Sequence, residues 1–244
     1  MIPPVTAKPQ RGVFITIEGL DGCGKSTQLG KLAATLRREG REVVLTREPG
    51  GTSLGESIRD VALDSRTAQL SPRAEMAMMF AARAQHVDQV ILPALERGAF
   101  VLCDRFTDST EAYQGGGRQL GAAPVRALHK LLCHGLDPDL TILMDSDVEA
   151  SVERARRRNR LRESKQASAH SHGRRTKAAN KAANESRFEH ESREFFERVH
   201  DAYLAIARRE PERVVLVNAR RPIPHVQREI WSAVRERALR PLMR

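Results

Sequence analysis

The feature that most constrains this chain is a glycine-rich stretch, residues 19–26, that directly follows an apolar run. It reads Gly-Leu-Asp-Gly-Cys-Gly-Lys-Ser and fits the pattern G-x-x-x-x-G-K-[ST] at every fixed position. Residues 13–17 before it have the composition of a buried strand, and residues 25–39 after it place leucines on one helical face. A dinucleotide-binding loop has a different glycine spacing and needs no lysine. The sequence therefore predicts a strand, a loop and a helix that hold the phosphates of a nucleoside triphosphate.

Each residue type in this loop has a mechanical part. The glycines allow backbone angles and close approaches that a Cβ would block. The loop N–H groups and the start of the helix then surround the phosphates. Lys25 supplies a cation for the outer phosphates, and the Ser26 hydroxyl suits Mg²⁺. The predicted nucleotide-binding residues are Gly19, Leu20, Asp21, Gly22, Cys23, Gly24, Lys25, Ser26 and Thr27.

Strand and helix patterns alternate along the rest of the chain. The patterns predict strands at 13–17, 42–46, 99–103, 140–144 and 213–217, and helices at 25–39, 54–63, 73–92, 124–134, 147–158, 188–209 and 223–239. Such alternation indicates an α/β fold with a parallel sheet covered by helices on both faces. Ligands bind at the carboxyl ends of the strands in these sheets. The polar residues that follow each strand are therefore the candidates for function.

Length and cysteine content set the outer limits of the prediction. The 244 residues suffice for one large domain, which we expect at 12–244 after a disordered lead-in at 1–11 that lacks the apolar segment of a secretory signal. We find no run of about 20 apolar residues that would span a membrane. The three cysteines, odd in number and without metal-site spacing, favour a reduced cytoplasmic protein.

Positive charge is concentrated in one segment. Residues 154–187 hold twelve Lys or Arg and two acidic residues, so they account for the whole net charge of +10. This pattern favours a local anion-handling element and disfavours a nucleic-acid-binding face. Residues 160–186 contain a single large aliphatic residue, Leu161, and are predicted to be a mobile or disordered insertion. The insertion could lengthen a lid, bind a polyanion or be a tolerated surface loop.

Acidic and basic residues follow three of the predicted strands. Asp104 ends an apolar strand, where it can hold Mg²⁺ or its water shell, and Arg105 can bind a phosphate through two parallel hydrogen bonds. Glu48 lies in a rigid turn after the second strand. Asp145 also ends a strand, and its position alone fits a helix cap and a water-mediated metal contact equally well.

Taken together, these motifs resemble bacterial thymidylate kinases. The resemblance rests on Phe14 to Gly19, the phosphate loop, Thr46 to Thr52, Asp104 to Ser109, and Ala112-Tyr113-Gln114; it covers residues 12–158 and resumes at Arg187. It implies a three-layer P-loop NTPase fold, a five-stranded parallel sheet flanked by helices, and a basic lid at about 150–187 that carries the inserted loop. It also implies ATP-dependent, Mg²⁺-assisted phosphorylation of dTMP to dTDP in dTTP synthesis, and a homodimer.

The resemblance assigns roles by matching position. Asp21 would face the acceptor sugar, Arg59 and Arg105 would hold the thymidylate phosphate, and Arg83 would donate to thymine O4. Gly22 stands where a related class carries an arginine, which implies that the lid supplies one. The implied catalytic residues are Lys25, Arg105, Arg154, Arg156 and Arg158, the metal residues are Ser26 and Asp104, and the acceptor residues are Asp21, Glu48, Pro49, Arg59, Met79, Arg83, Arg105, Ser109, Thr110 and Gln114.

One departure from the family falls inside the expected acceptor site. The family usually places a thymine-stacking phenylalanine four residues before Arg83, where this chain has Met79, with Phe80 one step later. One step turns a helical side chain by about 100°, so Phe80 should point elsewhere. We expect Met79 to cover the base with its polarisable thioether, the alternative being that both side chains are core.

Two other functions compete with this prediction. A P-loop kinase for another monophosphate would differ in acceptor preference, because Arg83 and Gln114 suit a pyrimidine with a 4-oxo group. A nucleic-acid-associated ATPase would use the basic insertion as a tether, and its binding would depend steeply on salt. The acceptor-site residues would then be idle, which disfavours it.

Overall fold

The structure is a computed structural model that describes residues 11–64, 69–170 and 187–239. Of the expected lead-in, only Arg11 lies within these ranges, where its guanidinium contacts Asp139 at 2.9 Å. Residues 171–186 of the expected insertion lie outside the described residues.

Within the described residues, five parallel strands form one sheet in the order β2-β3-β1-β4-β5. The strands are β1 (Phe14–Glu18), β2 (Val43–Arg47), β3 (Phe100–Asp104), β4 (Leu140–Asp145) and β5 (Val214–Asn218). Each lies within one residue of its predicted bounds, so the predicted α/β fold with a five-stranded parallel sheet is confirmed. Asp104 pairs in register with Ile17 on one side and Arg47 on the other, which aligns the carboxyl ends of three strands.

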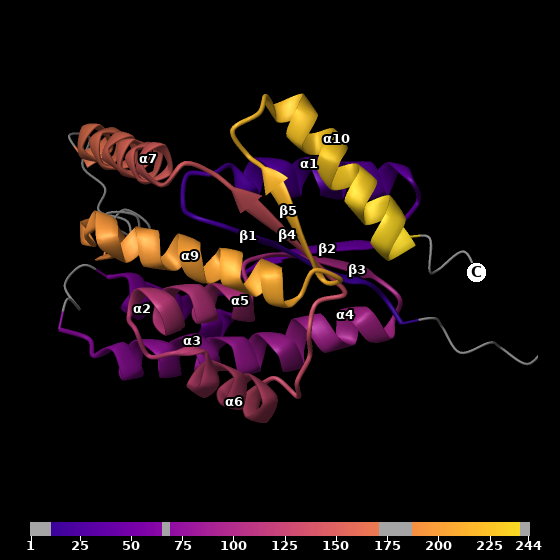
Figure 1. Cartoon of the computed structure of the whole chain (residues 1–244), viewed down its shortest axis with the longest axis horizontal. Coiled ribbons are helices and arrows are strands. Elements are labelled where there is room, and N and C mark those ends of the chain that lie inside the picture. Colours follow the sequence, from indigo (N-terminus) through magenta and orange to yellow (C-terminus); the bar gives the residue numbers. More distant parts are fainter. Residues whose placement is uncertain (1–10, 65–68, 171–186, 240–244) are drawn as a thin grey trace, which may run out of the picture.

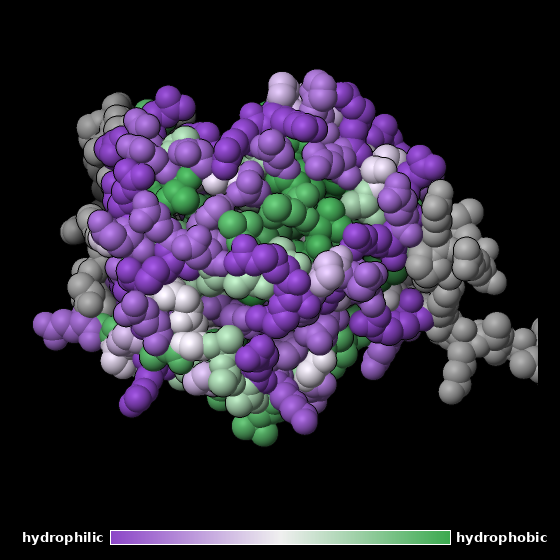
Figure 2. All heavy atoms as spheres, viewed as in Figure 1, coloured by the Kyte–Doolittle hydropathy of each residue, from purple (hydrophilic) through white to green (hydrophobic). Residues whose placement is uncertain are grey.

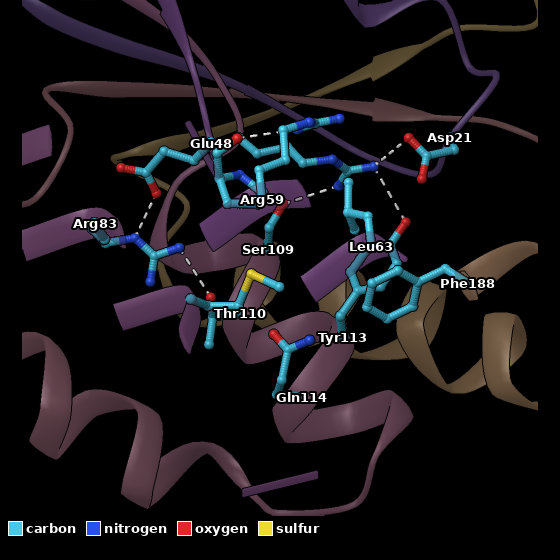
Figure 3. A pocket seen from close by; sticks show the side chains of 13 residues that line it. Asp21, Glu48, Arg59, Leu63, Arg83, Ser109, Thr110, Tyr113, Gln114 and Phe188 are labelled. Atoms are coloured by element: carbon cyan, nitrogen blue, oxygen red, sulfur yellow. Dashed lines mark hydrogen bonds and ion pairs between the residues drawn. The ribbon is translucent and has the colours of Figure 1, made fainter. Parts of the chain in front are cut away.

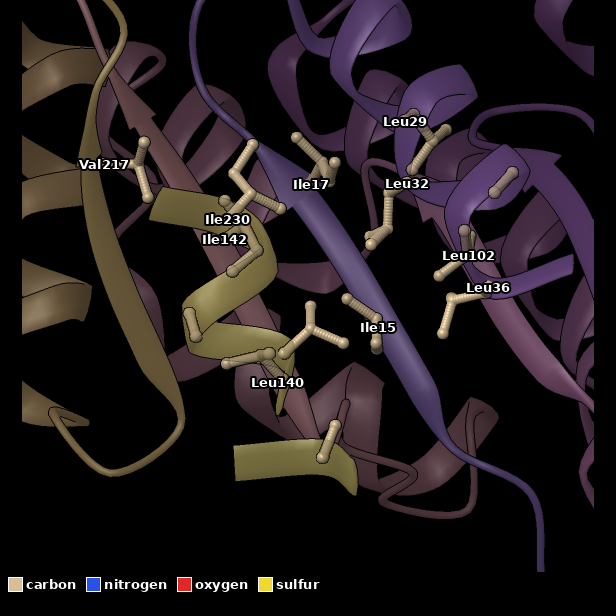
Figure 4. Close-up of a cluster of buried hydrophobic side chains, with 14 of the residues drawn as sticks. Ile15, Ile17, Leu29, Leu32, Leu36, Leu102, Leu140, Ile142, Val217 and Ile230 are labelled. Atoms are coloured by element: carbon tan, nitrogen blue, oxygen red, sulfur yellow. The ribbon is translucent and has the colours of Figure 1, made fainter. Parts of the chain in front are cut away.

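Helices cover both faces of this sheet (Figure 1). On one face, α1 (Lys25–Arg38) and α10 (Ile223–Val234) pack on alternate strand residues such as Ile15 and Ile17 (Figure 4). On the other lie α3 (Pro72–His86), α4 (Leu92–Glu96), α6 (Ala122–Leu132) and α9 (Arg193–Arg209), with α2 (Ser53–Leu63) against α3. The sheet is therefore the middle of three layers, and its carboxyl edge is left for the site.

A helical segment after β3 was missed by the sequence analysis. It consists of α5 (Thr107–Thr110) and a π-helical turn, Glu111–Gly117, that packs against α9. The packing is close, because a Cβ at Gly117 would overlap the ring of Phe195 and one at Gly116 would overlap Ala202. This segment carries three predicted acceptor residues on one helical stretch.

The expected insertion begins as a helix and not as a disordered segment. We predicted a helix at 147–158, whereas α7 spans Val148–His170 and so includes the first residues of the expected insertion, 160–170. Low hydrophobicity argued against independent folding, but this stretch is rich in Ala, Arg, Lys, Glu and Gln, which favour helices. The chain returns through a 3₁₀ turn, Arg187–His190, before α9 begins.

The face drawn in Figure 2 is mostly hydrophilic, with an apolar area where β5 runs between α9 and α10. Leu216 of β5 is exposed there, as expected for a strand at the sheet edge. Among the described residues, no helix has both the length and the apolar character needed to cross a membrane.

Candidate active site

The phosphate loop joins β1 to α1 in a left-handed turn. Gly19, Gly22 and Gly24 all have positive φ, which L side chains rarely adopt. The buried Lys25 donates from Nζ to the backbone oxygens of Leu20 at 2.9 Å and Gly19 at 3.1 Å. Its charge is thereby held inside the curve of the loop, beside the backbone N–H groups that surround an anion.

Only some of the predicted loop residues direct their side chains into the space in front of the loop. Thr27, Ser26 and Lys25 line the space in front of the loop. Leu20 and Cys23 are buried in two hydrophobic clusters, so they contribute only their backbones to the loop.

The two predicted metal residues lie together at the end of β3. Ser26 Oγ donates to Asp104 Oδ2 at 2.9 Å, which joins the first turn of α1 to the end of β3. Hydroxyl and carboxylate oxygens are ligands that suit Mg²⁺. Asp145 instead accepts from His200 Nε2 at 2.8 Å, and the helix-capping role falls to Asp147, which accepts from the N–H of Ala150.

Arg105 occupies the centre of the site. Its φ of 75° is unusual for a residue with a side chain and turns the backbone sharply after β3. The guanidinium donates to Asp21 at 2.8 Å, Ser109 at 2.9 Å and Tyr203 at 3.1 Å, and it lies over the ring of Tyr113. Burial alone would raise the pKa of Asp21, but the charges of Arg105 and Lys25 outweigh it and hold that pKa well below its usual range.

A buried carboxylate binds the two hydroxyl groups, of Ser109 and Tyr203, that Arg105 contacts. Glu18, at the end of β1, accepts from Ser109 Oγ at 2.6 Å, Tyr203 OH at 2.9 Å and the Phe106 N–H at 2.7 Å. Burial and the nearby charge of Asp108 raise the pKa of Glu18 to about 7 against the opposing charge of Arg105. Glu18 and Tyr203 were missed as site residues: Glu18 belongs to the motif Phe14 to Gly19 and could have been predicted, whereas no motif marks Tyr203.

All ten predicted acceptor residues line one pocket, which we call the inner pocket (Figure 3). It measures about 540 Å³, including the part open to solvent, and Leu63, Tyr113 and Phe188 complete its lining. Tyr113 belongs to the motif Ala112-Tyr113-Gln114 and could have been predicted as an acceptor residue. Phe188 comes from the far side of the insertion, and no local pattern marks it.

A buried arginine forms the deep wall of the inner pocket. Arg83 donates from Nε to Glu48 at 2.6 Å and from Nη2 to Thr110 at 3.0 Å, while His86 holds the second oxygen of Glu48 at 2.8 Å. Its Nη1 is buried and has no hydrogen-bond partner among the described residues. The guanidinium lines the pocket and can only donate, so a ligand group that contacts it must be an acceptor.

Met79 and Phe80 point in different directions, as their separation on α3 predicts. Met79 lines the inner pocket. Phe80 is fully buried in the cluster beneath the sheet, where the Arg83 guanidinium lies 4.9 Å from its ring centroid. Of these two side chains, only Met79 lines the inner pocket.

A second pocket, the loop pocket, lies in front of the phosphate loop. It measures about 830 Å³, including the part open to solvent, and its lining includes Lys25, Ser26, Asp104 and Arg47, the last not predicted. Four of its residues also line the inner pocket: Asp21, Glu48, Arg59 and Arg105. The two pockets thus meet at a boundary formed by two carboxylates and two guanidiniums.

The three predicted lid arginines differ in position on α7. Arg158 lines the loop pocket. Arg154 donates to the backbone oxygen of Gly22 at 2.9 Å, and Arg156 donates to that of Glu191 at 3.3 Å. A Cβ at Gly22 would overlap the backbone of Ser151 in α7, so an arginine at position 22 does not fit this arrangement.

Comparison with known proteins points to one family. A family model described as thymidylate kinase matches residues 17–188. Thymidylate kinase of Pseudomonas fluorescens (strain SBW25) is 48% identical over 219 residues, covering 90% of this chain and 93% of that protein. Thymidylate kinase of Desulfovibrio desulfuricans is 45% identical over 222 residues, covering 91% and 94%. A crystal structure of thymidylate kinase from Ehrlichia chaffeensis is similar with a TM-score of 0.66 and 30% identity, covering 92% of this chain and 99% of that one.

Proposed function

The chain belongs to the thymidylate kinase family, and we propose how its own residues phosphorylate dTMP with ATP. The observation that carries the proposal is the shared boundary of the two pockets. The phosphate loop lies on one side of Arg105 and the inner pocket lies on the other. In-line transfer requires this arrangement, because the donor and acceptor phosphates must meet at one point.

The inner pocket is the site for dTMP in this proposal. Thymine O4 accepts from the Arg83 guanidinium, and Met79 covers the ring. Arg105 and Arg59 hold the acceptor phosphate at the boundary, while Asp21 faces the sugar. A base with an amino group in place of O4 would bring one hydrogen-bond donor against another, the Arg83 guanidinium, and would be rejected.

The loop pocket is the site for the triphosphate of ATP. The loop N–H groups and Lys25 bind the phosphates, and Arg158 reaches the same space from α7. Ser26 and Asp104 would hold Mg²⁺, which neutralises charge on the phosphates when bound. Fixed cations stabilise the charge that spreads over the transferred phosphoryl group.

We also propose that the protein is a cytoplasmic homodimer. The three cysteines are free and buried, which suits a reducing compartment. Leu54 and Val61 of α2 and Leu131 of α6 are exposed apolar residues on helices that could face a second copy. Light scattering after size-exclusion chromatography tests the dimer, and a monomer at micromolar concentration would contradict it.

The reaction is tested by measuring ADP release with Mg·ATP and dTMP, dUMP, CMP, AMP, GMP or no acceptor. We expect fast turnover with dTMP, slower turnover with dUMP and negligible turnover with the others. Lys25→Ala controls for contaminating kinases. Hydrolysis of ATP without acceptor preference, especially if DNA or RNA increased it, would contradict the proposal.

A further inference from the structure

Glu75 is a buried carboxylate that none of the steps above uses. It lies in the first turn of α3 with no exposed surface. Its Oε1 accepts from Gln114 Nε2 at 2.7 Å, and its Oε2 contacts Arg187 Nη2 at 2.5 Å and Arg118 Nη2 at 3.1 Å. One carboxylate thus joins α3, the π-helical turn and the segment that returns from α7.

The contact with Gln114 determines which end of that amide faces the inner pocket. An ionised carboxylate only accepts hydrogen bonds, so it must face the NH₂ group of Gln114 and not its oxygen. Arg118 and Arg187 also donate to this carboxylate, so each of these partners of Glu75 is a hydrogen-bond donor. Figure 3 shows the Gln114 oxygen directed toward the pocket interior on the side of Thr110. The pocket is therefore offered an acceptor at Gln114 beside the donor at Arg83.

This pair of groups matches one class of pyrimidine. A 4-oxo pyrimidine presents an N3–H donor next to the O4 acceptor, whereas a 4-amino pyrimidine presents an N3 acceptor next to an N4 donor. Arg83 can only donate, but a free glutamine amide could turn over and offer its NH₂ to the wrong base. Whatever holds the amide in place therefore contributes to discrimination.

Glu75 also ties the inner pocket to the chain that returns from α7. Arg187 is buried beside Phe188, which lines the pocket and packs edge-on against Tyr113 at 5.6 Å between ring centroids. The guanidiniums of Arg118 and Arg187 both lie over the Phe188 ring. The carboxylate that orients Gln114 thus also anchors the aromatic wall of the same pocket.

From these contacts we infer that Glu75 is a positioning residue that sets acceptor specificity, by locking Gln114 with its oxygen toward the base and by anchoring Arg187 and Phe188. The inference rests on the proposed function, because it assumes that the inner pocket binds a pyrimidine.

The test compares Glu75→Gln with wild type for dTMP and dCMP. Glutamine at position 75 can accept or donate, so Gln114 is free to turn over. We expect the ratio of kcat/KM for dTMP to that for dCMP to fall by about tenfold, the equivalent of one misplaced hydrogen bond. The loss should lie in the KM for the acceptor, with the KM for ATP unchanged.

Glu111→Gln is the matched control. Glu111 is also buried, lies three residues before Gln114 and binds Arg209 at 2.6 Å, but it lines neither pocket. Its substitution should leave the dTMP to dCMP ratio unchanged. An unchanged ratio in folded Glu75→Gln, or an equal loss in both variants, would overturn the inference.

A second measurement uses the wild-type protein, in case Glu75→Gln does not fold. The Gln114 side-chain amide signals can be assigned by NMR from their absence in Gln114→Leu. We expect at least one of these protons to be protected from exchange with solvent, and fast exchange of both would overturn the inference. Wild-type protein with no preference for dTMP over dCMP would instead overturn the proposed function, and this inference with it.

Discussion

In the inner pocket, Arg83 is 3% exposed and bonded through Glu48, Thr110 and the Phe106 backbone, whereas in the loop pocket Arg158 is an exposed side chain on α7. The first arginine is fixed before any ligand arrives, because each of its bonds ends on a buried group. The second interacts electrostatically with Asp21, but no hydrogen bond joins it to another residue in the described parts of the chain. The contrast indicates that the acceptor site is preorganised by Arg83, whereas the Arg158 side chain can change its position when the substrates bind.

The largest effect should come from a substitution in the loop pocket. Arg158→Ala should lower kcat by about 10³-fold or more, the effect typical of an arginine that stabilises the transferred phosphoryl group. Arg156→Ala should remain close to wild type, because Arg156 contacts the Glu191 backbone and does not line the loop pocket. Steady-state kinetics with saturating ATP and dTMP measure both. An equal loss of kcat in the two variants would contradict the specific role given to Arg158.

Arg83→Gln removes the fixed guanidinium from the inner pocket. Loss of a charged donor to the base should reduce kcat/KM for dTMP by about 100-fold. The variant also removes the guanidinium from the buried Glu48 and leaves it only His86, which should lower the free energy of unfolding by about 3–5 kcal/mol. Initial rates and urea unfolding report the two effects separately.

Arg213→Gln is the control for Arg83→Gln. Arg213 binds Asp108 through two bonds of 2.8 and 2.9 Å but lines neither pocket. It should lose stability with little change in the KM for dTMP. If the KM rose equally in both variants, the effect of Arg83 would reflect destabilisation alone.

Glu18 binds the Ser109 and Tyr203 hydroxyls that Arg105 also contacts, and it makes stability depend on pH. Because the folded state raises the pKa of Glu18 from 4.5 to about 7, its contribution to stability is complete below pH 4.5 and is lost as pH rises through 7. The loss amounts to about 3 kcal/mol. Glu18→Gln cannot ionise, so urea unfolding should show the variant gaining stability relative to wild type between pH 5 and pH 8. A constant difference across that range would contradict the assigned pKa.

The smallest effect should come from the cover of the inner pocket. Met79→Ala should raise the KM for dTMP by about tenfold, consistent with the loss of a few buried methylene contacts with the base. Phe80→Ala should instead lower the free energy of unfolding by about 3–5 kcal/mol, because it opens a cavity in the core. An unchanged KM in Met79→Ala would show that Met79 does not cover the base.

The parts of the molecule that follow a regular pattern could be predicted from sequence. The five strands and most helices have clear apolar periods, and acceptor residues such as Glu48, Arg105 and Ser109 follow strand ends, so their convergence follows from the parallel sheet. Arg59, Met79 and Arg83 lie instead on α2 and α3, and only the family resemblance indicated them. The segment 107–117 could not be predicted, because its helix is polar, ends in three glycines and is stabilised by packing on α9. Tyr203 and Phe188 reach the site from distant segments, and only the folded chain brings them there.

The most direct test of the central claim is the dTMP to dCMP ratio of kcat/KM in Arg158→Ala. If recognition resides in the inner pocket and Arg158 acts only on transfer, both nucleotides should lose turnover by the same factor and the ratio should equal that of wild type. A ratio that fell together with kcat would contradict the account, because selection of the base would then depend on the lid arginine.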